Sequence, residues 1–267
     1  MEDNINRKRQ TLIRTILIVV LILALLAIGY CVWYLIQYQK GAQLGSDLQT
    51  IGVIGADVID EEAPEQQKSV EIPIDFEALW EVNPDIYAWV QVPGTAISYP
   101  VVHREGDDGF YTNHSSDGAY YSGGSIYSED YNSEDFTDPM TVLYGHNLRN
   151  GTMFAQLNDF ADVTVFSNHP RIYVFLPDRA LVYDIFSAAP HSNEHLLGCH
   201  DFTDQEDFET FYSDLAATRS MGANFRTTLF PTFDKDRVLT LSTCYRPNNQ
   251  QRFLVMGRLV ADIPAKN

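Results

Sequence analysis

The sequence predicts a mostly β domain, either a barrel or a sandwich, that follows a single membrane-spanning helix. Two observations support this fold class. From about residue 88 onward, short runs of β-branched and aromatic residues alternate with turns rich in Gly, Asn, Asp and Ser, which is typical of proteins built from many short strands. Near the N-terminus lies a long run without charged residues. The 267 residues leave room for one globular domain of roughly 190 to 200 residues beside that helix.

The N-terminal apolar run covers residues 15–36 and consists mainly of Leu, Ile, Val and Ala. About 20 helical residues cross a bilayer, so the run is long enough to span a membrane. A cleaved signal peptide would have a shorter apolar core and a small-residue exit, whereas this run ends with bulky aromatic residues such as Trp33 and Tyr34. We therefore expect an uncleaved anchor, and its length disfavours the alternative of a buried helix in a soluble protein.

Charged residues around the span predict its orientation. One basic residue, Lys40, follows it closely, and four precede it: Arg7, Lys8, Arg9 and Arg14. The positive-inside rule then places residues 1–14 in the cytoplasm and the remaining chain outside the cell. From residue 41 onward there are 34 acidic and 13 basic residues, a formal charge of −21. A surface of this charge repels nucleic acid, so we expect no nucleic-acid partner.

The segment 37–70 is interpreted as an extracellular linker because much of it is rich in Gly, Gln, Asp and Glu with weak periodicity. The outer domain then covers residues 71–267. Its first expected element is a helix over 76–82, whose N-cap is Asp75 and whose apolar residues form one packing face. Asn83-Pro84 ends this helix.

Eight strands are expected in the outer domain. The runs that predict them are 88–92, 97–102, 125–127, 141–146, 171–175, 179–189, 238–243 and 252–259. A helix is expected over 152–160. The connection between the sixth and seventh strands is too long to lack structure in a compact domain. A third helix is predicted there by residues that recur at helical spacing, with Thr203 or Asp204 as its cap: Phe208, Phe211, Tyr212, Leu215 and Ala216.

Three side chains at the ends of predicted strands suit acyl transfer. Cys244 comes where the strand 238–243 ends, and Arg252 where the next strand begins, after a turn at Pro247–Asn249. Antiparallel neighbours joined by a short turn bring the thiol and the guanidinium to the same end of a sheet. His146 ends another strand. A Cys nucleophile, a His acid and base, and a fixed positive charge for the oxyanion are the groups that acyl transfer needs.

Other roles are open to the cysteines and arginines. Cys199 and Cys244 could form one disulfide, although two thiols outside the membrane do not make a disulfide scaffold. Arg246 competes with Arg252 for the place beside the thiol. Arg252 has the better geometry, because Arg246 lies in the turn whereas a residue eight positions after Cys244 returns beside it in a hairpin.

No metal site is expected. His191, His195 and His200 lie near one another in the sequence, but their spacing fits no compact zinc pattern. The acidic run 128–135 lacks the glycine and the terminal glutamate of a calcium-binding loop and is interpreted as a solvated loop.

Two motifs surround the candidate residues: Thr-Leu-Ser-Thr-Cys at 240–244 with Arg252 downstream, and Tyr-Gly-His-Asn at 144–147. Together they resemble the sortase family, the cysteine transpeptidases of Gram-positive cell surfaces, and the serine at position 242 points to class B. The resemblance extends over most of the chain after the first seventy residues. Its further matching segments are 76–85, 88–90, 93–95, 99–102 and 150–154.

The resemblance implies a closed eight-stranded β-barrel with an N-terminal helix, and a helix between the sixth and seventh strands that helps to wall a peptide groove. It also implies a chemistry. Cys244 attacks the Thr carbonyl of a C-terminal sorting motif in an exported protein, His146 protonates the departing amine, and Arg252 stabilises the oxyanion. An amine of a cell-wall peptide or of its lipid-linked precursor then resolves the thioester. No metal or organic cofactor is implied.

The resemblance further implies a single-pass membrane protein with an extracellular catalytic domain that anchors surface proteins to the cell wall. Ser242, Thr243 and Tyr245, beside the nucleophile, are predicted substrate contacts. A hydrolytic sortase or a pilus-type polymerase on the same fold is an alternative, and a non-catalytic surface adhesion domain is an alternative of another class. A papain-like protease is disfavoured because the Cys follows the His and no helix-borne Cys lies near the start of the domain.

Overall fold

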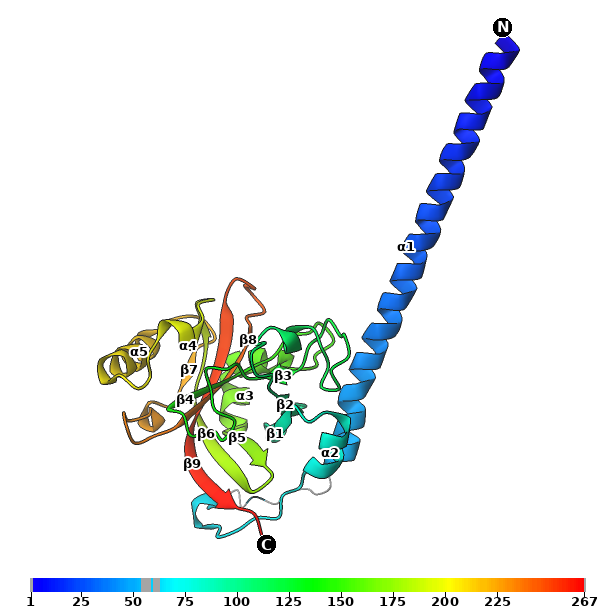
Figure 1. Ribbon diagram of the computed structural model, residues 1–267. Coiled ribbons are helices and arrows are strands. Elements are labelled where there is room, and N and C mark those ends of the chain that lie inside the picture. Colours follow the sequence, from blue (N-terminus) through cyan, green and yellow to red (C-terminus); the bar gives the residue numbers. More distant parts are fainter. Residues whose placement is uncertain (1, 54–58, 60–62, 267) are drawn as a thin grey trace.

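The N-terminal part of the chain is a single long helix. The computed structural model describes residues 2–53, 59 and 63–266, so the linker residues 54–58 and 60–62 lie outside the described residues. Helix α1 (Glu2–Gly52) projects far from the rest of the protein (Figure 1). Its stretch Leu12–Gly41 is long and apolar enough to cross a membrane, and its most apolar part is not buried by protein. This agrees with the predicted anchor.

The segment 37–70, interpreted from its composition as a linker, begins as a continuation of α1 to Gly52. The reason is packing that composition does not reveal. Leu48 is buried, and Leu44 packs against the same apolar cluster, which includes Phe76 and Leu79 of the domain. The part of the linker that the structure describes therefore starts as a rigid helix docked on the domain, not as a flexible tether.

Eight strands close into a barrel, which confirms the fold that the resemblance implied. The order around the ring is β5-β1-β2-β3-β4-β8-β9-β6, and β6 pairs back with β5. The pairs β2–β3 and β4–β8 are parallel, and the other ring pairs are antiparallel. The strands are β1 (Ile86–Gln91), β2 (Ser98–Val102), β3 (Ile126–Tyr127), β4 (Met140–Tyr144), β5 (Arg171–Leu176), β6 (Arg179–His191), β8 (Val238–Cys244) and β9 (Arg252–Pro264).

Every predicted strand overlaps an observed one, and the differences lie at the ends. Strand β4 stops at Tyr144, so His146 belongs to the loop that follows it. Strand β9 continues to Pro264 because it stays paired with β6 as far as Arg179. A two-residue strand that was not predicted, β7 (Asn224–Phe225), pairs with β6.

Helices α2 (Phe76–Val82) and α5 (Gln205–Ala217) pack against the outside of the barrel. Helix α2 is capped as predicted, because the Ala78 N–H donates to Asp75 Oδ1 at 3.0 Å. Helix α5 is capped by Asp204, whose Oδ1 accepts from the Asp207 N–H at 3.0 Å. The short helices are η1 (Pro64–Gln66), η2 (Phe110–Thr112), α4 (Leu196–Cys199) and η4 (Thr227–Leu229).

The helix predicted over 152–160 is a 3₁₀-helix, η3 (Ala155–Ala161), followed by α3 (Val163–Asn168). The apolar residues Phe154, Leu157 and Phe160 recur every third position, and all three are fully buried in the barrel cluster. A helix with three residues per turn places such residues on one face. The tighter helix therefore buries all three side chains together.

Both faces of the strand that carries the candidate cysteine are covered. Leu241 of β8 belongs to the cluster inside the barrel, whereas Val238 belongs to the cluster on the other side, under the aromatic residues of α5. Successive residues of a strand point to opposite faces. Thr243 therefore shares the interior face with Leu241, and Cys244 shares the outer face with Val238.

A charged cluster ties the acidic run 128–135 to the barrel. His103 follows β2, with Nδ1 2.8 Å from Glu134 Oε1 and Nε2 2.8 Å from Asp130 Oδ1. Burial lowers the pKa of His103, but the hydrogen bonds to Glu134 and Asp130 outweigh burial and raise that pKa above its ordinary value. The run is therefore held against the barrel by the imidazole of His103, where a solvated loop was predicted.

Replacing His103 with Asn should lower the free energy of unfolding at about pH 6 and have a much smaller effect at about pH 9. A raised pKa contributes stability that is fully present below the unfolded-state pKa of about 6.5 and is lost as the pH rises through the folded-state pKa. Urea titrations of both proteins across this range measure the difference. A difference that does not change with pH would show that the charged imidazole contributes nothing.

Candidate active site

The β8–β9 hairpin brings the predicted nucleophile and the predicted cation together. Cys244 and Arg252 are directly paired across the two antiparallel strands. Arg252 Nη1 donates to Cys244 Sγ at 3.6 Å. Cys244 is partly exposed and is a free thiol. The contact places a fixed positive charge beside the sulfur of the predicted nucleophile.

The predicted acid and base lies at the end of the strand on the other side of β8. Strands β4 and β8 are parallel, with Tyr144 opposite Ser242. The pairing continues past β4, because the Gly145 N–H donates to the Ser242 carbonyl at 3.1 Å. The same register places His146 level with Cys244, and neighbouring strands lie about 4.8 Å apart. The three candidate residues thus occupy the same end of three adjacent strands.

The tautomer of His146 follows from its hydrogen bond. Its Nε2 lies 2.8 Å from the carbonyl oxygen of Thr112. A carbonyl only accepts, so we assign the proton to Nε2. In a neutral imidazole Nδ1 is then the unprotonated nitrogen, and it is the atom left to exchange a proton with a thiol or an amine.

Two asparagines that the sequence did not single out for this role hold the backbone of the predicted nucleophile. The Cys244 carbonyl accepts from Asn147 Nδ2 at 3.0 Å and from Asn158 Nδ2 at 3.1 Å. Asn158 is buried and also accepts from the Arg246 N–H at 2.6 Å. It therefore bridges the peptide groups on both sides of Tyr245. Asn147 follows His146 in the motif Tyr-Gly-His-Asn at 144–147, so the sequence could have indicated it. No neighbouring sequence pattern indicates a role for Asn158.

Arg246 is engaged elsewhere. Its guanidinium donates to the Ala155 carbonyl at 2.9 Å and to Asp159 Oδ1 at 3.1 Å, both in η3. Arg246 thus fastens the hairpin to η3, while Arg252 lies against the sulfur. This is the arrangement expected from the positions of the two arginines in the hairpin.

A small pocket lies next to Arg252 on the outer face of the sheet. Its lining includes Tyr144, Ser242, Arg252 and Leu254 from the strands, and the segment 191–196 from the connection after β6. His191 is paired with Arg252 across β6 and β9. Burial lowers the pKa of His191, so its imidazole is neutral beside the guanidinium at neutral pH.

The comparison with known proteins decides the family. The family model described as Sortase domain matches residues 90–260. The chain belongs to the sortase family. It is 26% identical over 192 residues to sortase B of Listeria monocytogenes, covering 71% of this chain and 76% of that protein.

Two solved structures resemble this sortase. Clostridium perfringens sortase B is 28% identical with a TM-score of 0.62, covering 70% of this chain and 100% of that one. The Staphylococcus aureus sortase B–substrate complex is 26% identical with a TM-score of 0.59, covering 69% and 84%. The class B assignment made from the sequence motif is thereby confirmed.

The three predicted substrate contacts of the sortase lie in different surroundings. Ser242 lines the pocket beside Arg252. Thr243 does not, because its exposed fraction is 0% and its hydroxyl donates to the Gly145 carbonyl at 2.8 Å. The reason is strand alternation, which turns the neighbour of Cys244 into the barrel. Tyr245 is partly exposed and stacks on Phe253 with ring centroids 5.5 Å apart.

The connection between β6 and β7 contributes to this pocket and also covers the sheet. The segment 191–196 lines the pocket, whereas α5 covers the outer face of the sheet. Cys199 is an exposed free thiol, so the alternative disulfide with Cys244 is not formed. Two of the three clustered histidines pair with separate acidic groups, His195 with Glu129 and His200 with Asp207.

Replacing Asn158 with Asp should slow the alkylation of Cys244 by roughly tenfold, which corresponds to about 1.4 kcal/mol, the worth of about one hydrogen bond. Asp keeps the acceptor for the Arg246 N–H but loses the donor to the Cys244 carbonyl. The rate of iodoacetamide labelling against pH measures the effect, with Asn150→Asp in the exposed loop as the control. If the wild type, Asn158→Asp and Asn150→Asp were labelled at equal rates and unfolded at the same temperature, Asn158 would have no role in positioning Cys244.

Proposed function

We propose that this sortase is a membrane-anchored class B cysteine transpeptidase that attaches exported proteins to the cell wall. It cleaves a C-terminal sorting motif at Thr, as a thiol endopeptidase does, and transfers the new carboxyl end to an amine of a cell-wall peptide or its lipid-linked precursor. The observation that carries the proposal is the 3.6 Å contact between Arg252 Nη1 and the free, partly exposed Cys244 Sγ.

In the first half-reaction the Cys244 thiolate attacks the Thr carbonyl carbon. The C–S bond forms as the carbonyl becomes an oxyanion, and Arg252 donates to that oxyanion. His146, protonated at both nitrogens, gives its Nδ1 proton to the departing amine as the C–N bond breaks. The product is a thioester at Cys244 and a released C-terminal peptide.

In the second half-reaction an acceptor amine attacks the thioester carbon. His146, now neutral, takes a proton from this amine at Nδ1. The C–S bond breaks, the sulfur leaves as a thiolate beside Arg252, and the new amide links the exported protein to its acceptor. The chain's own residues perform both halves.

Membrane anchoring suits this chemistry. We propose that residues 15–36 span the membrane with residues 1–14 in the cytoplasm, that the linker 37–70 follows, and that the catalytic domain 71–267 is extracellular. The support is the apolar, unburied stretch Leu12–Gly41 of α1. Confining the enzyme to the surface where exported proteins emerge raises the effective concentration of both substrates.

The pocket lined by Arg252, whose guanidinium contacts Cys244, is the proposed site for the sorting motif. Its lining combines the donors of Arg252 with apolar groups of Leu254 and Leu196 and with polar side chains of the segment 191–196, so it offers a peptide both hydrogen-bonding and apolar contacts. The Staphylococcus aureus relative was solved with a substrate bound, which supports a sorting peptide as the substrate class here. Ser242 is the proposed contact of the peptide on β8.

Replacing Cys244 with Ala should abolish the thioester and all transfer, because it removes the thiol that Arg252 contacts. Intact-mass analysis of the protein with a sorting peptide should show a covalent adduct on the wild type and none on the variant. Adding a cell-wall amine, a lysine-bearing pilin peptide or water alone then separates anchoring, polymerisation and hydrolysis by the product formed.

An adduct on the Cys244→Ala protein would refute the assignment of the nucleophile. If neither protein formed an adduct with any sorting peptide, and iodoacetamide labelled Cys244 no faster than Cys199, the chain would instead fit the non-catalytic adhesion domain.

Replacing Arg252 with Ala should lower the rate of thioester formation by about 100- to 1000-fold, as the loss of an oxyanion donor does. Arg252→Lys should lie between, because it keeps the charge but not the forked donors. Single-turnover kinetics with a sorting peptide measure both. The matched control is Arg246→Ala, whose effect should be smaller than that of Arg252→Ala; the reverse order would exchange the roles of the two arginines.

A further inference from the structure

Helix α1 contacts one loop of the barrel with its aromatic residues. This loop, residues 115–124, lies between η2 and β3 and is called the docking loop below. Its contacts with α1 are the Trp33–Tyr120 ring stack with centroids 6.3 Å apart, the Tyr34 Oη–Ser122 Oγ hydrogen bond of 3.1 Å, and the Tyr38–Tyr121 ring contact with centroids 5.8 Å apart. The barrel thus touches α1 before the apolar stretch ends.

These contacts fix the depth of the docking loop relative to a membrane. Trp33 and Tyr34 belong to the proposed span 15–36 and to the apolar stretch that ends at Gly41. At a rise of about 1.5 Å per residue, Tyr34 lies only about 3 Å before residue 36 along the helix axis. Tyr120 and Ser122 lie beside these residues and therefore at the same depth, which is the headgroup level of the bilayer.

The composition of the docking loop suits that level. Residues 115–124 contain one charged residue, Asp117, in a domain whose formal charge is −21. Tyr120 is 43% exposed although it stacks on Trp33, and tyrosine and tryptophan favour the interface between lipid and water. Tyr131, which is 58% exposed, offers a contrast because it lies in the acidic run 128–135.

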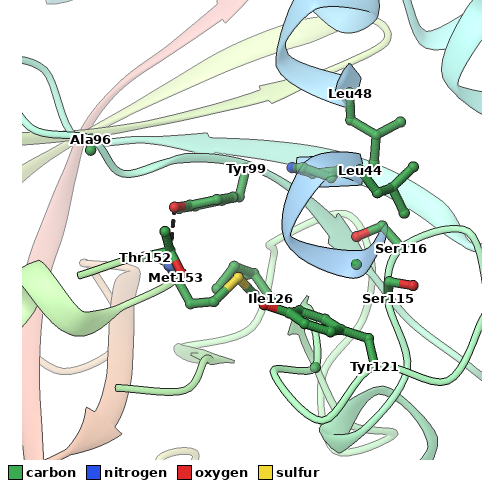
Figure 2. Close-up of a pocket in the computed structure, with 13 residues that line it drawn as sticks. Leu44, Leu48, Ala96, Tyr99, Ser115, Ser116, Tyr121, Ile126, Thr152 and Met153 are labelled. Carbon is green, nitrogen blue, oxygen red and sulfur yellow. Dashed lines mark hydrogen bonds between the residues drawn. The ribbon is translucent and has the colours of Figure 1, made fainter. Parts of the chain in front are cut away.

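A glycine allows α1 to dock this closely. A Cβ on Gly41 would overlap the ring of Tyr121. Glycine inside a helix costs roughly 0.5–1 kcal/mol relative to alanine, so its place at this contact serves the close approach. Beyond Gly41, Leu44 and Leu48 continue the contact and line a cavity of about 240 Å³ together with Tyr99, Tyr121 and Met153 (Figure 2).

The docking loop also contacts the candidate active site. A Cβ on Gly124, the last residue of the loop, would lie 3.0 Å from His146 Cδ2. Thr112, whose carbonyl binds His146 Nε2, lies shortly before the loop. In Figure 1 the β8–β9 turn lies at the top of the barrel, on the same side as the N-terminal end of α1. The rim that carries Cys244 therefore faces the side where the membrane would lie.

We propose that the docking loop is a second membrane-contacting element: it lies in the headgroup region of the bilayer against Trp33 and Tyr34 and holds the His146 rim of the barrel at the membrane surface. The partner is the interfacial layer of the lipid bilayer. The inference rests on the membrane anchoring in the proposed function and adds a lipid contact made by the catalytic domain itself.

Photocrosslinking of the full-length chain in vesicles of phosphatidylcholine and phosphatidylglycerol tests the inference. A benzophenone amino acid replaces Leu23, Tyr120 or Tyr131, one at a time, and lipid adducts are detected by peptide mass. Leu23 is 60% exposed on α1 and reports on the span. We expect adducts at positions 23 and 120 and only background at 131.

Adducts at 23 but not at 120, or equal yields at 120 and 131, would overturn the membrane-contacting loop and leave the anchor in place. No adduct at 23 would overturn the anchor and this inference with it. Thermal unfolding of each labelled protein confirms that it is folded.

Replacing Gly41 with Leu tests whether the close docking of α1 places the docking loop in the bilayer. The added side chain separates α1 from Tyr121, so the lipid adduct at position 120 should be lost while the adduct at 23 persists. The matched control is Gly29→Leu, because nothing lies within 4 Å of a Cβ at Gly29. An adduct at 120 that survives Gly41→Leu unchanged would show that close docking of α1 does not place the loop in the bilayer.

Discussion

The site depends on the pairing of β8 with two different neighbours. On one side the antiparallel register sets Cys244 opposite Arg252, and on the other the parallel register with β4 continues toward His146. A shift of either register by one residue would turn the side chains to the opposite face. Closure of the barrel through the β5–β6 pair removes the free edges at which such a shift could begin.

Cys244, His146 and Arg252 lie at or just beyond the ends of strands. Strand pairing alone therefore does not fix their positions, and side-chain hydrogen bonds contribute. Asn147 and Asn158 hold the Cys244 carbonyl, and the Thr112 carbonyl orients His146. These partners come from distant parts of the chain and meet only in the closed barrel. The thiol of Cys244 is thus partly exposed while the peptide group that carries it is fixed, which is the preorganisation that the proposed acyl transfer needs.

Much of this was predictable from the sequence. Short runs of β-branched and aromatic residues predicted the eight strands. The position of Arg252, eight residues after Cys244 and beyond a turn, predicted that the two residues lie opposite each other. The rest depends on long-range packing. The buried face of α1 near Leu48, the 3₁₀ geometry around Leu157 and the contact of Asn158 with Cys244 leave no local signal. Thr243 was predicted as a substrate contact from its nearness to Cys244 alone, and strand alternation turns it inward.

The most direct test of this account asks whether β4 and β8 place position 146 beside the nucleophile. In the full-length His146→Cys protein, mild oxidation should form a disulfide between the introduced thiol and Cys244, because continuing the β4–β8 register sets the two positions level on neighbouring strands, which lie about 4.8 Å apart. The exposed Cys199 serves as a competing thiol in the same chain. A bridge to Cys244 is the predicted result; two thiols that stay free, or a bridge to Cys199, would contradict the account.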